Sequence, residues 1–304
     1  MWTKSVTDNE IKVRDVVIDT DKGGEPVELI QITDLHLSWV SEEDRKDPVI
    51  ASSYEFRRWG KDGAFWPRAE KCLDFAKDAD AIVITGDIYD YLTDETVKKT
   101  RELLFDKYDN LIACIGNHEP AKKMQGEVEE TMPLEDRIKY LETRWCNDIY
   151  YCSRVFGEKV MVIALDNSSA SRFWDRQIEP LRSDLAKARE KGYAVLLFYH
   201  DPMSTGDERY IKVDTLDRGD ATCRNFYNSN VQISASSEGA SGEIYRMIIS
   251  NGDIIKGAFC GHYHSDFYTE IAARTADGAP TVIPQYVLKG VVYDKGNVLR
   301  ITVR

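Results

Sequence analysis

The feature that most constrains this chain is a set of five apolar runs, each followed at once by acidic, histidine or amide side chains. The runs are residues 29–33, 81–85, 111–115, 195–199 and 254–260. They are short, rich in β-branched residues and bounded by Gly, Asp or Asn, a pattern typical of buried strands. Helical periodicity lies between them over the first two-thirds of the chain, which predicts parallel strands joined by crossover helices.

The same patterns extend along the whole chain and predict an α/β fold. We expect strands at residues 11–18, 27–33, 81–85, 111–115, 160–165, 194–199, 254–260, 281–284, 286–293 and 298–303. We expect helices near residues 66–78, 93–107, 133–145 and 241–251, and a further one from Trp174 to a stop at Gly192. The final strands follow one another directly, with Asp294-Lys295-Gly296-Asn297 as a hairpin turn, so the sheets should be mixed.

Two long segments, 38–66 and 201–240, interrupt the alternation of strands and helices. Neither resembles a linker between domains, and a layered α/β domain often reaches a length of 304 residues. We therefore predict one domain over residues 1–304 with two insertions. The aromatic residues of the first insertion either stack a flat group at the site or pack against the sheet. Four basic residues of the second insertion could meet a substrate phosphate: Arg209, Lys212, Arg218 and Arg224.

All five histidines of the chain belong to the polar groups that follow strands. These groups are Asp34 with His36, Asp87 with Asp90, Asn117 with His118 and Glu119, His200 alone, and His262 with His264. In parallel α/β sheets, ligands bind in the crevice outside the carboxyl ends of the strands. Because independent structural accidents would not place every histidine after a strand, we expect these groups to converge on one site.

Imidazole, carboxylate and amide groups that converge in this way indicate metal ligands. Mixtures of imidazole and carboxylate suit zinc, manganese, iron or nickel. Together with Asp34, Asp87 and Asn117, the five histidines supply seven candidate ligands and one further imidazole. Seven are too many for one ion that keeps an open catalytic position. Two ions that share a bridging carboxylate account for the number. A pair of ions about 3.5–4 Å apart can clamp an in-line displacement at phosphorus.

In the order and strand context of these residues, the chain resembles the calcineurin-like metallophosphoesterases. Their five motifs match Asp34-x-His36, Gly86-Asp87-x-x-Asp90, Gly116-Asn117-His118-Glu119, His200 and Gly261-His262-x-His264. The resemblance covers roughly residues 28–266. It implies two mixed β-sheets packed as a sandwich and flanked by helices, a four-layer αββα fold. Within the superfamily, residues 31–37 look most like the bacterial cyclic-nucleotide phosphodiesterase branch.

The resemblance also implies a role for each residue of the site. The first metal ion would be held by Asp34, His36 and His264, the second by Asn117, His200 and His262, and Asp87 would bridge both. Asn117 and His118 would face the substrate, and His118 would protonate the leaving oxygen. Asp90 would hydrogen-bond His118 and fix its orientation, with Glu119 as the competing candidate for that partner.

These roles imply a phosphoesterase that depends on two divalent or trivalent ions, with manganese, iron, zinc or nickel as candidates. A hydroxide that bridges the ions would attack a phosphomonoester or phosphodiester. Tyr91 stands where the protein phosphatases of the family carry an arginine, which weakens an interpretation as a phosphoprotein phosphatase. Two other interpretations stay open: a non-catalytic metal-containing scaffold on the same fold, and a nuclease.

The charge of the chain bears on its partners. It carries 40 basic and 52 acidic residues, a net charge of −12, and no basic stretch, which disfavours long nucleic acids. No run approaches the roughly 20 apolar residues of a membrane span, and the first residues lack the apolar segment of a signal peptide. We therefore expect a cytoplasmic enzyme that acts on a small phosphate ester and binds no membrane. The six cysteines show no CxxC spacing, which argues against a thiolate zinc site.

Overall fold

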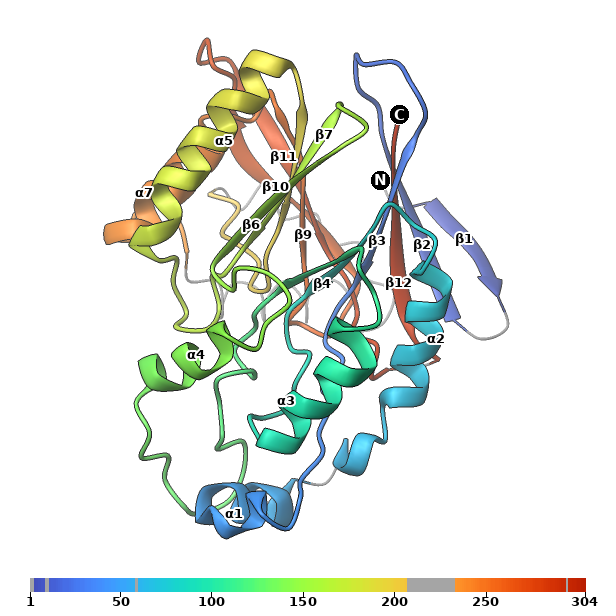
Figure 1. The fold of residues 1–304 in the computed structure, drawn as a ribbon. Coiled ribbons are helices and arrows are strands. Elements are labelled where there is room, and N and C mark those ends of the chain that lie inside the picture. Colours follow the sequence, from blue (N-terminus) through green and yellow to red (C-terminus); the bar gives the residue numbers. More distant parts are fainter. Residues whose placement is uncertain (1–2, 9–10, 58–59, 207–232, 294) are drawn as a thin grey trace.

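The computed structural model describes residues 3–8, 11–57, 60–206, 233–293 and 295–304. Within these residues, two six-stranded sheets pack against each other and helices cover their outer faces (Figure 1). This arrangement is the predicted αββα sandwich, so the fold class is confirmed. Among the described helices, none has the length and apolar character needed to cross a membrane.

The first sheet is mixed, with three parallel strands at one side. In spatial order it contains β1 (Thr3–Asp8), β2 (Ile11–Ile18), β12 (Asn297–Val303), β3 (Val27–Ile32), β4 (Ala81–Thr85) and β5 (Leu111–Cys114). β3, β4 and β5 are parallel, as the alternation of strands and helices predicts. The last strand of the chain, β12, lies between β2, to which it is parallel, and β3, to which it is antiparallel.

The second sheet is also mixed and is antiparallel at both of its edges. In spatial order it contains β10 (Phe267–Arg274), β11 (Pro280–Val287), β9 (Ile255–Cys260), β8 (Ala194–Phe198), β7 (Val160–Leu165) and β6 (Tyr151–Phe156). The four central strands are parallel, while β10 and β6 run antiparallel to their neighbours. Each sheet therefore presents the carboxyl ends of several parallel strands at one edge.

The helices divide between the two outer faces. The first sheet is covered by α2 (Trp66–Ala76), α3 (Asp94–Thr100), which continues as a π-helix over Arg101–Phe105, and α4 (Leu134–Glu142). The second sheet is covered by α5 (Ile178–Lys191) and α7 (Gly239–Ile249), which pack side by side (Figure 1). The remaining helix, α1 (Pro48–Phe56), lies in the first insertion with short 3-10 turns at Asp44–Lys46 and Lys61–Gly63, and a third such turn, Asp175–Gln177, precedes α5.

Alternation along the central strands explains their continuous apolar sequences. In β4, Ala81 and Val83 point into the core between the sheets, whereas Ile82 and Ile84 pack under the helices. β8 behaves in the same way, with Leu196 facing the other sheet. A strand that is buried on both faces carries apolar residues at every position, so its sequence does not alternate between apolar and polar residues. These strands are packed from both sides, and the loops that carry the polar residues begin at their carboxyl ends.

One expected element and one expected turn are wrong. The strand predicted at residues 286–293 is absent beyond Val287, where β11 ends. The hairpin predicted at residues 294–297 does not form, because β11 and β12 belong to different sheets; Asp294 itself lies outside the described residues. The reason is tertiary. Leu288 donates its amide to the carbonyl of Cys260 in the second sheet, and Val291 donates to Thr33 at the end of β3, so this segment bridges the two sheets.

The first insertion folds against the domain. Trp39, Phe65 and Trp66 pack against the core beneath the helices, so for these aromatic residues the structure favours packing over stacking on a ligand. Tyr54 contacts a small cluster that includes Tyr91. Trp59 and the basic residues of the second insertion lie outside the described residues: Arg209, Lys212, Arg218 and Arg224. The division into one domain with two insertions stays a prediction.

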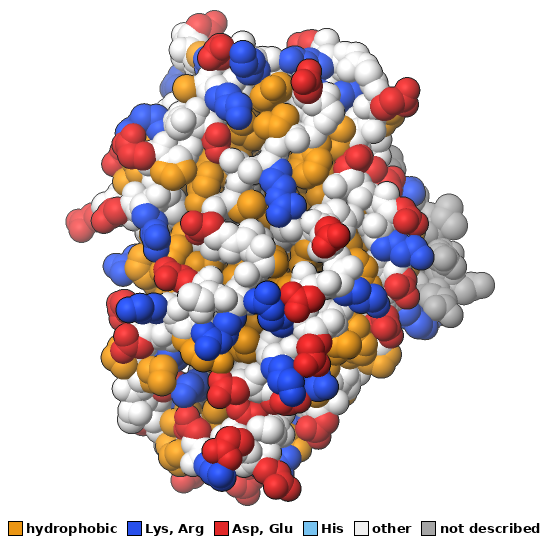
Figure 2. All heavy atoms as spheres, in the orientation of Figure 1, with side chains coloured by type: hydrophobic (Ala, Val, Ile, Leu, Met, Phe, Trp, Pro, Cys, Tyr) orange, Lys and Arg blue, Asp and Glu red, His pale blue; other side chains and the backbone are white. Residues whose placement is uncertain are grey.

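The surface shows no segregation of charge on the face drawn in Figure 2. Acidic and basic side chains are interspersed there, with apolar side chains between them. A face of this kind lacks the continuous basic stripe that usually accompanies binding to polyanions.

Candidate metal centre

The loops after β3 and β4 stay paired beyond the end of the sheet. The amide of Asp34 donates to the carbonyl of Gly86 at 3.1 Å, and the amide of His36 donates to the carbonyl of Asp87 at 2.9 Å. The amide of Asp90 donates back to the carbonyl of Leu37 at 2.9 Å. These bonds set the two loops in register, which places the acidic and histidine side chains of both loops together.

The second sheet delivers three histidines to the same place. His200 lies two residues after Phe198, where β8 ends, and its Nδ1 is 2.6 Å from the carbonyl oxygen of Thr85 in the first sheet. His262 and His264 follow β9, and the amide of His262 donates to Oδ2 of Asp34 at 3.2 Å. Hydrogen bonds between the sheets therefore fix the position of the histidines relative to the carboxylates.

Five of the predicted ligands share an unusual backbone conformation. Left-handed φ angles are found at Asp34 (52°), His36 (43°), Asp87 (51°), His262 (72°) and His264 (52°). A non-glycine residue in this region costs on the order of 1–3 kcal/mol and persists only where the surrounding structure holds it, most often at functional sites. The strain lets each loop turn sharply as it leaves the sheet, so that its side chains face the same point.

Two motif glycines are explained by close approach. Gly86 has a φ of 86°, and a Cβ at this position would lie 2.5 Å from Nδ1 of His200. A Cβ on Gly116 would collide with the Asp87 carboxylate. At both positions only glycine leaves room for the neighbouring ligand side chain.

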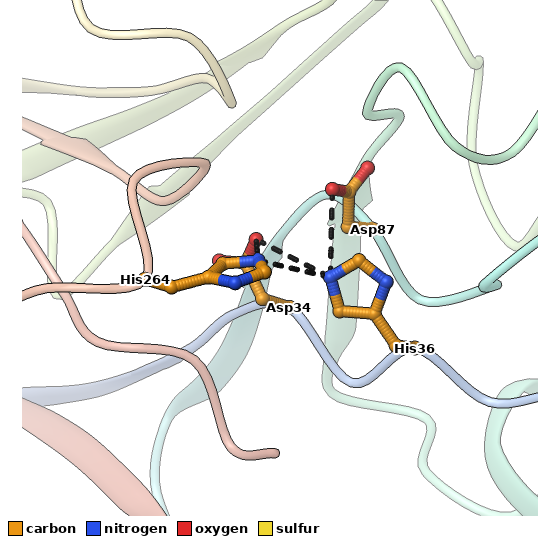
Figure 3. Close-up of side chains that lie close together, drawn as sticks. All are labelled: Asp34, His36, Asp87 and His264. Atoms are coloured by element: carbon orange, nitrogen blue, oxygen red, sulfur yellow. Dashed lines mark hydrogen bonds and ion pairs between the residues drawn. The ribbon is translucent and has the colours of Figure 1, made fainter. Parts of the chain in front are cut away.

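The side chains form two groups, each compact enough to hold an ion. In the first group, atoms of Asp34, His36, Asp87 and His264 all lie within 4.8 Å of one another (Figure 3). In the second group the same holds for Asp87, His200 and His262. Asp87 belongs to both groups: its Oδ2 is 3.7 Å from Nε2 of His36 and 3.1 Å from Nε2 of His200.

Three buried polar atoms at this site form no well-directed hydrogen bond with any described residue. They are Oδ1 of Asp34, Oδ1 of Asn117 and Nε2 of His200. Oδ1 of Asp34 lies 3.0 Å from Nε2 of His264, and Nε2 of His200 lies 3.1 Å from Oδ2 of Asp87, but neither contact has the geometry of a hydrogen bond. A buried polar atom whose hydrogen-bonding capacity is left unsatisfied costs about 1–3 kcal/mol. Carboxylate oxygen, amide oxygen and imidazole nitrogen are suitable ligands for divalent transition-metal ions. Asn117 is not part of the two ligand groups described above, which contain only acidic residues and histidines. Both of its neighbours in the chain, Gly116 and His118, lie against the Asp87 carboxylate, which places Asn117 close to the centre.

The ring orientation of three histidines is set from the Nδ1 side. Nδ1 of His36 lies 3.1 Å from Oδ1 of Asp90, and Nδ1 of His264 lies 3.2 Å from the hydroxyl of Tyr293. Nδ1 of His200 carries the proton, because its partner, the Thr85 carbonyl, can only accept a hydrogen bond. Each ring therefore turns its Nε2 toward the centre, as in proteins whose outer hydrogen bonds orient metal-binding histidines.

A further support around His262 is not among the residues predicted from the sequence. Its Nδ1 lies 3.3 Å from Oδ1 of Asp201, which also accepts a hydrogen bond from the Ser168 hydroxyl at 2.8 Å. Asn167 bonds the backbone of Asp201 on both sides. Asn167 and Ser168 could have been found from the sequence, because Asp166-Asn167-Ser168 directly follows the apolar strand β7, as the other site residues follow theirs.

Asp90 contacts His118 mainly through its main chain. Nδ1 of His118 donates to the carbonyl oxygen of Asp90 at 2.8 Å, while the nearer carboxylate oxygen is 3.6 Å away. Glu119, the competing candidate for this partner, is engaged elsewhere. Its buried carboxylate accepts backbone amides of Gly116 (2.7 Å), Asp87 (3.3 Å), Tyr89 (3.2 Å) and Ile88. Glu119 thus joins the loops after β4 and β5, and burial together with the Asp87 charge raises its pKa to about 7.

Arg57, from the first insertion, completes the surroundings of Asp90. Its Nε and Nη2 lie 2.7 Å and 2.5 Å from the two carboxylate oxygens. His36, Asp90 and His118 are also close enough to hold an ion, but the guanidinium already occupies this carboxylate. No local pattern marks Arg57 in the sequence, because its partner is 33 positions away.

The electrostatics of the site favour ionised carboxylates. Burial alone would raise the pKa of Asp34 and Asp87. The charges and hydrogen bonds of several histidines together outweigh burial, with His264 contributing most at Asp34 and His200 at Asp87, so both pKa values lie below the ordinary range. Burial likewise opposes a charge on His36, yet hydrogen bonds to Asp34 and Asp90 raise its pKa to about 9. The Asp34 and Asp87 carboxylates are therefore buried and ionised, and they are stable in that form only with positive charge close to them.

The chain is similar to a known protein family and to solved structures. A family model described as calcineurin-like phosphoesterase matches residues 28–266. No curated protein matches the chain in a sequence search. Among solved structures, the chain is similar to a dimetal phosphatase from Danio rerio, with a TM-score of 0.42, 13% identity and coverage of 88% of each chain. It is also similar to PhoD, with a TM-score of 0.46 and 10% identity, where 90% of this chain spans 58% of that one.

Proposed function

The chain belongs to the calcineurin-like phosphoesterases, and we propose that it hydrolyses a phosphomonoester or phosphodiester at a centre of two metal ions. The observation that carries the proposal is the position of Asp87, whose carboxylate is shared by two ligand groups. A single shared carboxylate is what a bridged pair of ions needs, and it is not needed by one isolated ion.

The residues of the chain fit this centre by chemistry and by number. Asp34, His36 and His264 would hold the first ion, and Asn117, His200 and His262 the second, with Asp87 between them. The buried atoms of Asp34, Asn117 and His200 that lack a directed hydrogen bond support this assignment. Manganese, iron, zinc and nickel are all compatible with such ligands. When bound, two such ions supply positive charge at the phosphoryl group and lower the pKa of a water molecule.

His118 is proposed as the residue that protonates the leaving oxygen. Its Nδ1 is held by the Asp90 carbonyl, and its Nε2 lies 3.9 Å from Oδ2 of Asp87 at the centre. The side chain is 14% exposed, whereas that of His36 is fully buried. A substrate can therefore reach His118, and a positioned acid of this kind contributes about 10²- to 10⁴-fold to a rate. Asn117, the preceding residue, would contact the substrate beside it.

The test is a panel of esters offered to the protein after chelation and after reconstitution with Mn²⁺. We expect turnover of an aryl monoester, an aryl diester or a cyclic nucleotide by the reconstituted protein alone, and none by a reconstituted Asp87→Ala variant. Equal activity before and after chelation would contradict the proposal. A protein that binds two ions and hydrolyses no ester would be a metal-containing scaffold, and cleavage of oligonucleotides alone would indicate a nuclease.

A further inference from the structure

The first insertion contributes one side chain directly to the surroundings of the centre. Arg57 follows the last residue of α1, and its backbone amide donates to the carbonyl of Ser53. The residue is 8% exposed, and its guanidinium approaches both oxygens of Asp90. A bidentate pair between arginine and a carboxylate combines charge with a fixed planar geometry, which a single hydrogen bond does not provide.

Oδ1 of Asp90 lies between three nitrogen atoms. It is 2.5 Å from Nη2 of Arg57, 3.1 Å from Nδ1 of His36 and 3.6 Å from Nδ1 of His118. The orientation of this carboxylate therefore affects His36, a proposed metal ligand, through a hydrogen bond. The same carboxylate lies beside His118, the proposed acid, whose own hydrogen bond goes to the main-chain carbonyl of Asp90. Without Arg57, the carboxylate would keep its contact with His36 but lose the planar partner that sets its rotation.

The neighbouring position in the sequence cannot supply this guanidinium. Tyr91 follows Asp90 directly, but its side chain is buried with Val40 and Ile50 in the first insertion. The side chain of Tyr91 therefore points away from the Asp90 carboxylate. The positive charge beside this carboxylate comes from Arg57 in the first insertion.

We propose that Arg57 is a positioning residue, which holds Asp90 so that His36 and His118 keep the orientations that metal binding and proton transfer require. The inference rests on the proposed function for its catalytic part and on the ligand geometry alone for its metal-binding part. The first insertion is, on this view, part of the working site and more than a cover over the sheet.

The insertion is also anchored by contacts that do not involve Arg57. Nζ of Lys122 lies 3.0 Å from Oδ2 of Asp47, and the Ser53 hydroxyl donates to the carbonyl of Lys122 at 3.0 Å. Removing the Lys122 charge should weaken this attachment of the insertion while leaving the contacts of Asp90 in place. Lys122→Met is therefore a matched control for a purely structural role of Arg57.

The experiment compares the wild-type protein with Arg57→Ala, Arg57→Lys and Lys122→Met in two measurements. In the first, metal-free protein is titrated with Co²⁺ and followed by its visible absorption. We expect Arg57→Ala to weaken Co²⁺ binding by about 10- to 100-fold, the usual effect of removing an outer partner of a ligand, and Lys122→Met to bind as the wild type does. Equal binding by all four proteins would overturn the metal-binding part.

In the second measurement, ester hydrolysis is followed with saturating Mn²⁺. We expect Arg57→Ala to lower kcat by about 10- to 100-fold with little change in KM, and millimolar guanidinium to restore part of the loss. Rescue by guanidinium would not occur if the insertion had merely come loose. Equal losses in Arg57→Ala and Lys122→Met, or the absence of rescue, would overturn the catalytic part.

Two further outcomes separate the inference from the proposed function. If the wild type hydrolyses no ester but Arg57→Ala still binds Co²⁺ more weakly, the proposed function fails and the positioning role stands. If Arg57→Ala does not fold, Arg57→Lys decides, because lysine keeps the charge but lacks the planar fork. Weaker Co²⁺ binding by Arg57→Lys than by Lys122→Met would support the role, and equal binding would overturn it.

Discussion

Oδ2 of Asp87 lies 3.1 Å from Nε2 of His200, although the two residues are carried by different sheets. Asp87 follows β4 in the first sheet, and His200 follows β8 in the second. The centre therefore exists only when the two sheets have packed against each other. Because a site of this kind is absent from the unfolded chain, ions bound there would add their binding energy to the stability of the sandwich.

The shared position of Asp87 predicts different metal contents for two alanine variants. We expect the wild type to bind two ions, Asp87→Ala to lose both, and His200→Ala to keep an ion at Asp34, His36 and His264. Neither variant should hydrolyse an aryl phosphate. Equilibrium dialysis followed by elemental analysis measures the content, with Asp253→Ala, at an ion pair with Arg189 on the surface, as the control. Two tightly bound ions in Asp87→Ala would contradict a bridging role.

Replacing His118 by alanine should separate catalysis from metal binding. His118 holds no ion in the proposed assignment, so His118→Ala should keep both ions while turnover falls by about 10²- to 10⁴-fold. The loss should be larger for an alkyl phosphate than for a nitrophenyl phosphate, because a poor leaving group depends more on protonation. Steady-state rates on the two esters, with ion content measured in the same samples, check this. Loss of both ions from the variant would show that the residue has a different role.

Gly86 provides a test of the close packing around His200. Alanine at this position adds the cost of a left-handed φ, about 1–2 kcal/mol, and a contact of 2.5 Å with the His200 ring. Gly278 is the matched control, because its φ of 87° is almost the same but no atom lies within 4 Å of an added Cβ. Urea unfolding should show a greater loss of stability in Gly86→Ala than in Gly278→Ala, together with a loss of bound metal. Equal losses in the two variants would show that His200 moves aside freely.

Asp166 gives the stability of the protein a specific dependence on pH. Burial raises the pKa of this carboxyl from 3.8 to about 6, despite hydrogen bonds from Ser169, Ser168 and Trp174. The folded state then binds the proton of Asp166 more tightly than the unfolded chain does. The contribution of this proton to the free energy of unfolding is therefore full below pH 3.8 and is lost as the pH rises through 6. The difference in unfolding free energy between wild type and Asp166→Asn should fall by about 3 kcal/mol across that interval.

Denaturant unfolding at several pH values measures this dependence. Ser169→Ala serves as the comparison, because it removes a hydrogen bond that lowers the pKa of Asp166. It should steepen the decline in stability between these pH values, whereas Asp166→Asn should flatten it. A stability difference that does not change with pH would mean that Asp166 keeps its ordinary pKa in the folded protein.

Much of the fold could be predicted because its evidence is local. Central strands such as β4 and β8 appear at their predicted positions, since runs of apolar β-branched residues bounded by turns need no distant partner to be recognised. Edge strand β6, with side chains only partly buried, and helix α1, inside the insertion, show weaker patterns and were missed. The hairpin expected at residues 294–297 was wrong for the opposite reason: its sequence suits a turn, but packing sends the strands to different sheets.

The residues that follow strands can be recognised in the sequence, and in parallel sheets the chain direction places all such residues at one edge. For that reason the candidate ligands could be named from the order of residues alone. The contact of Arg57 with Asp90, that of Asp201 with His262 and the joining of two loops by Glu119 appear only in the folded chain. These contacts depend on how an insertion docks and on how two sheets align. Such alignment is a property of the packed core, and no pattern within one segment encodes it.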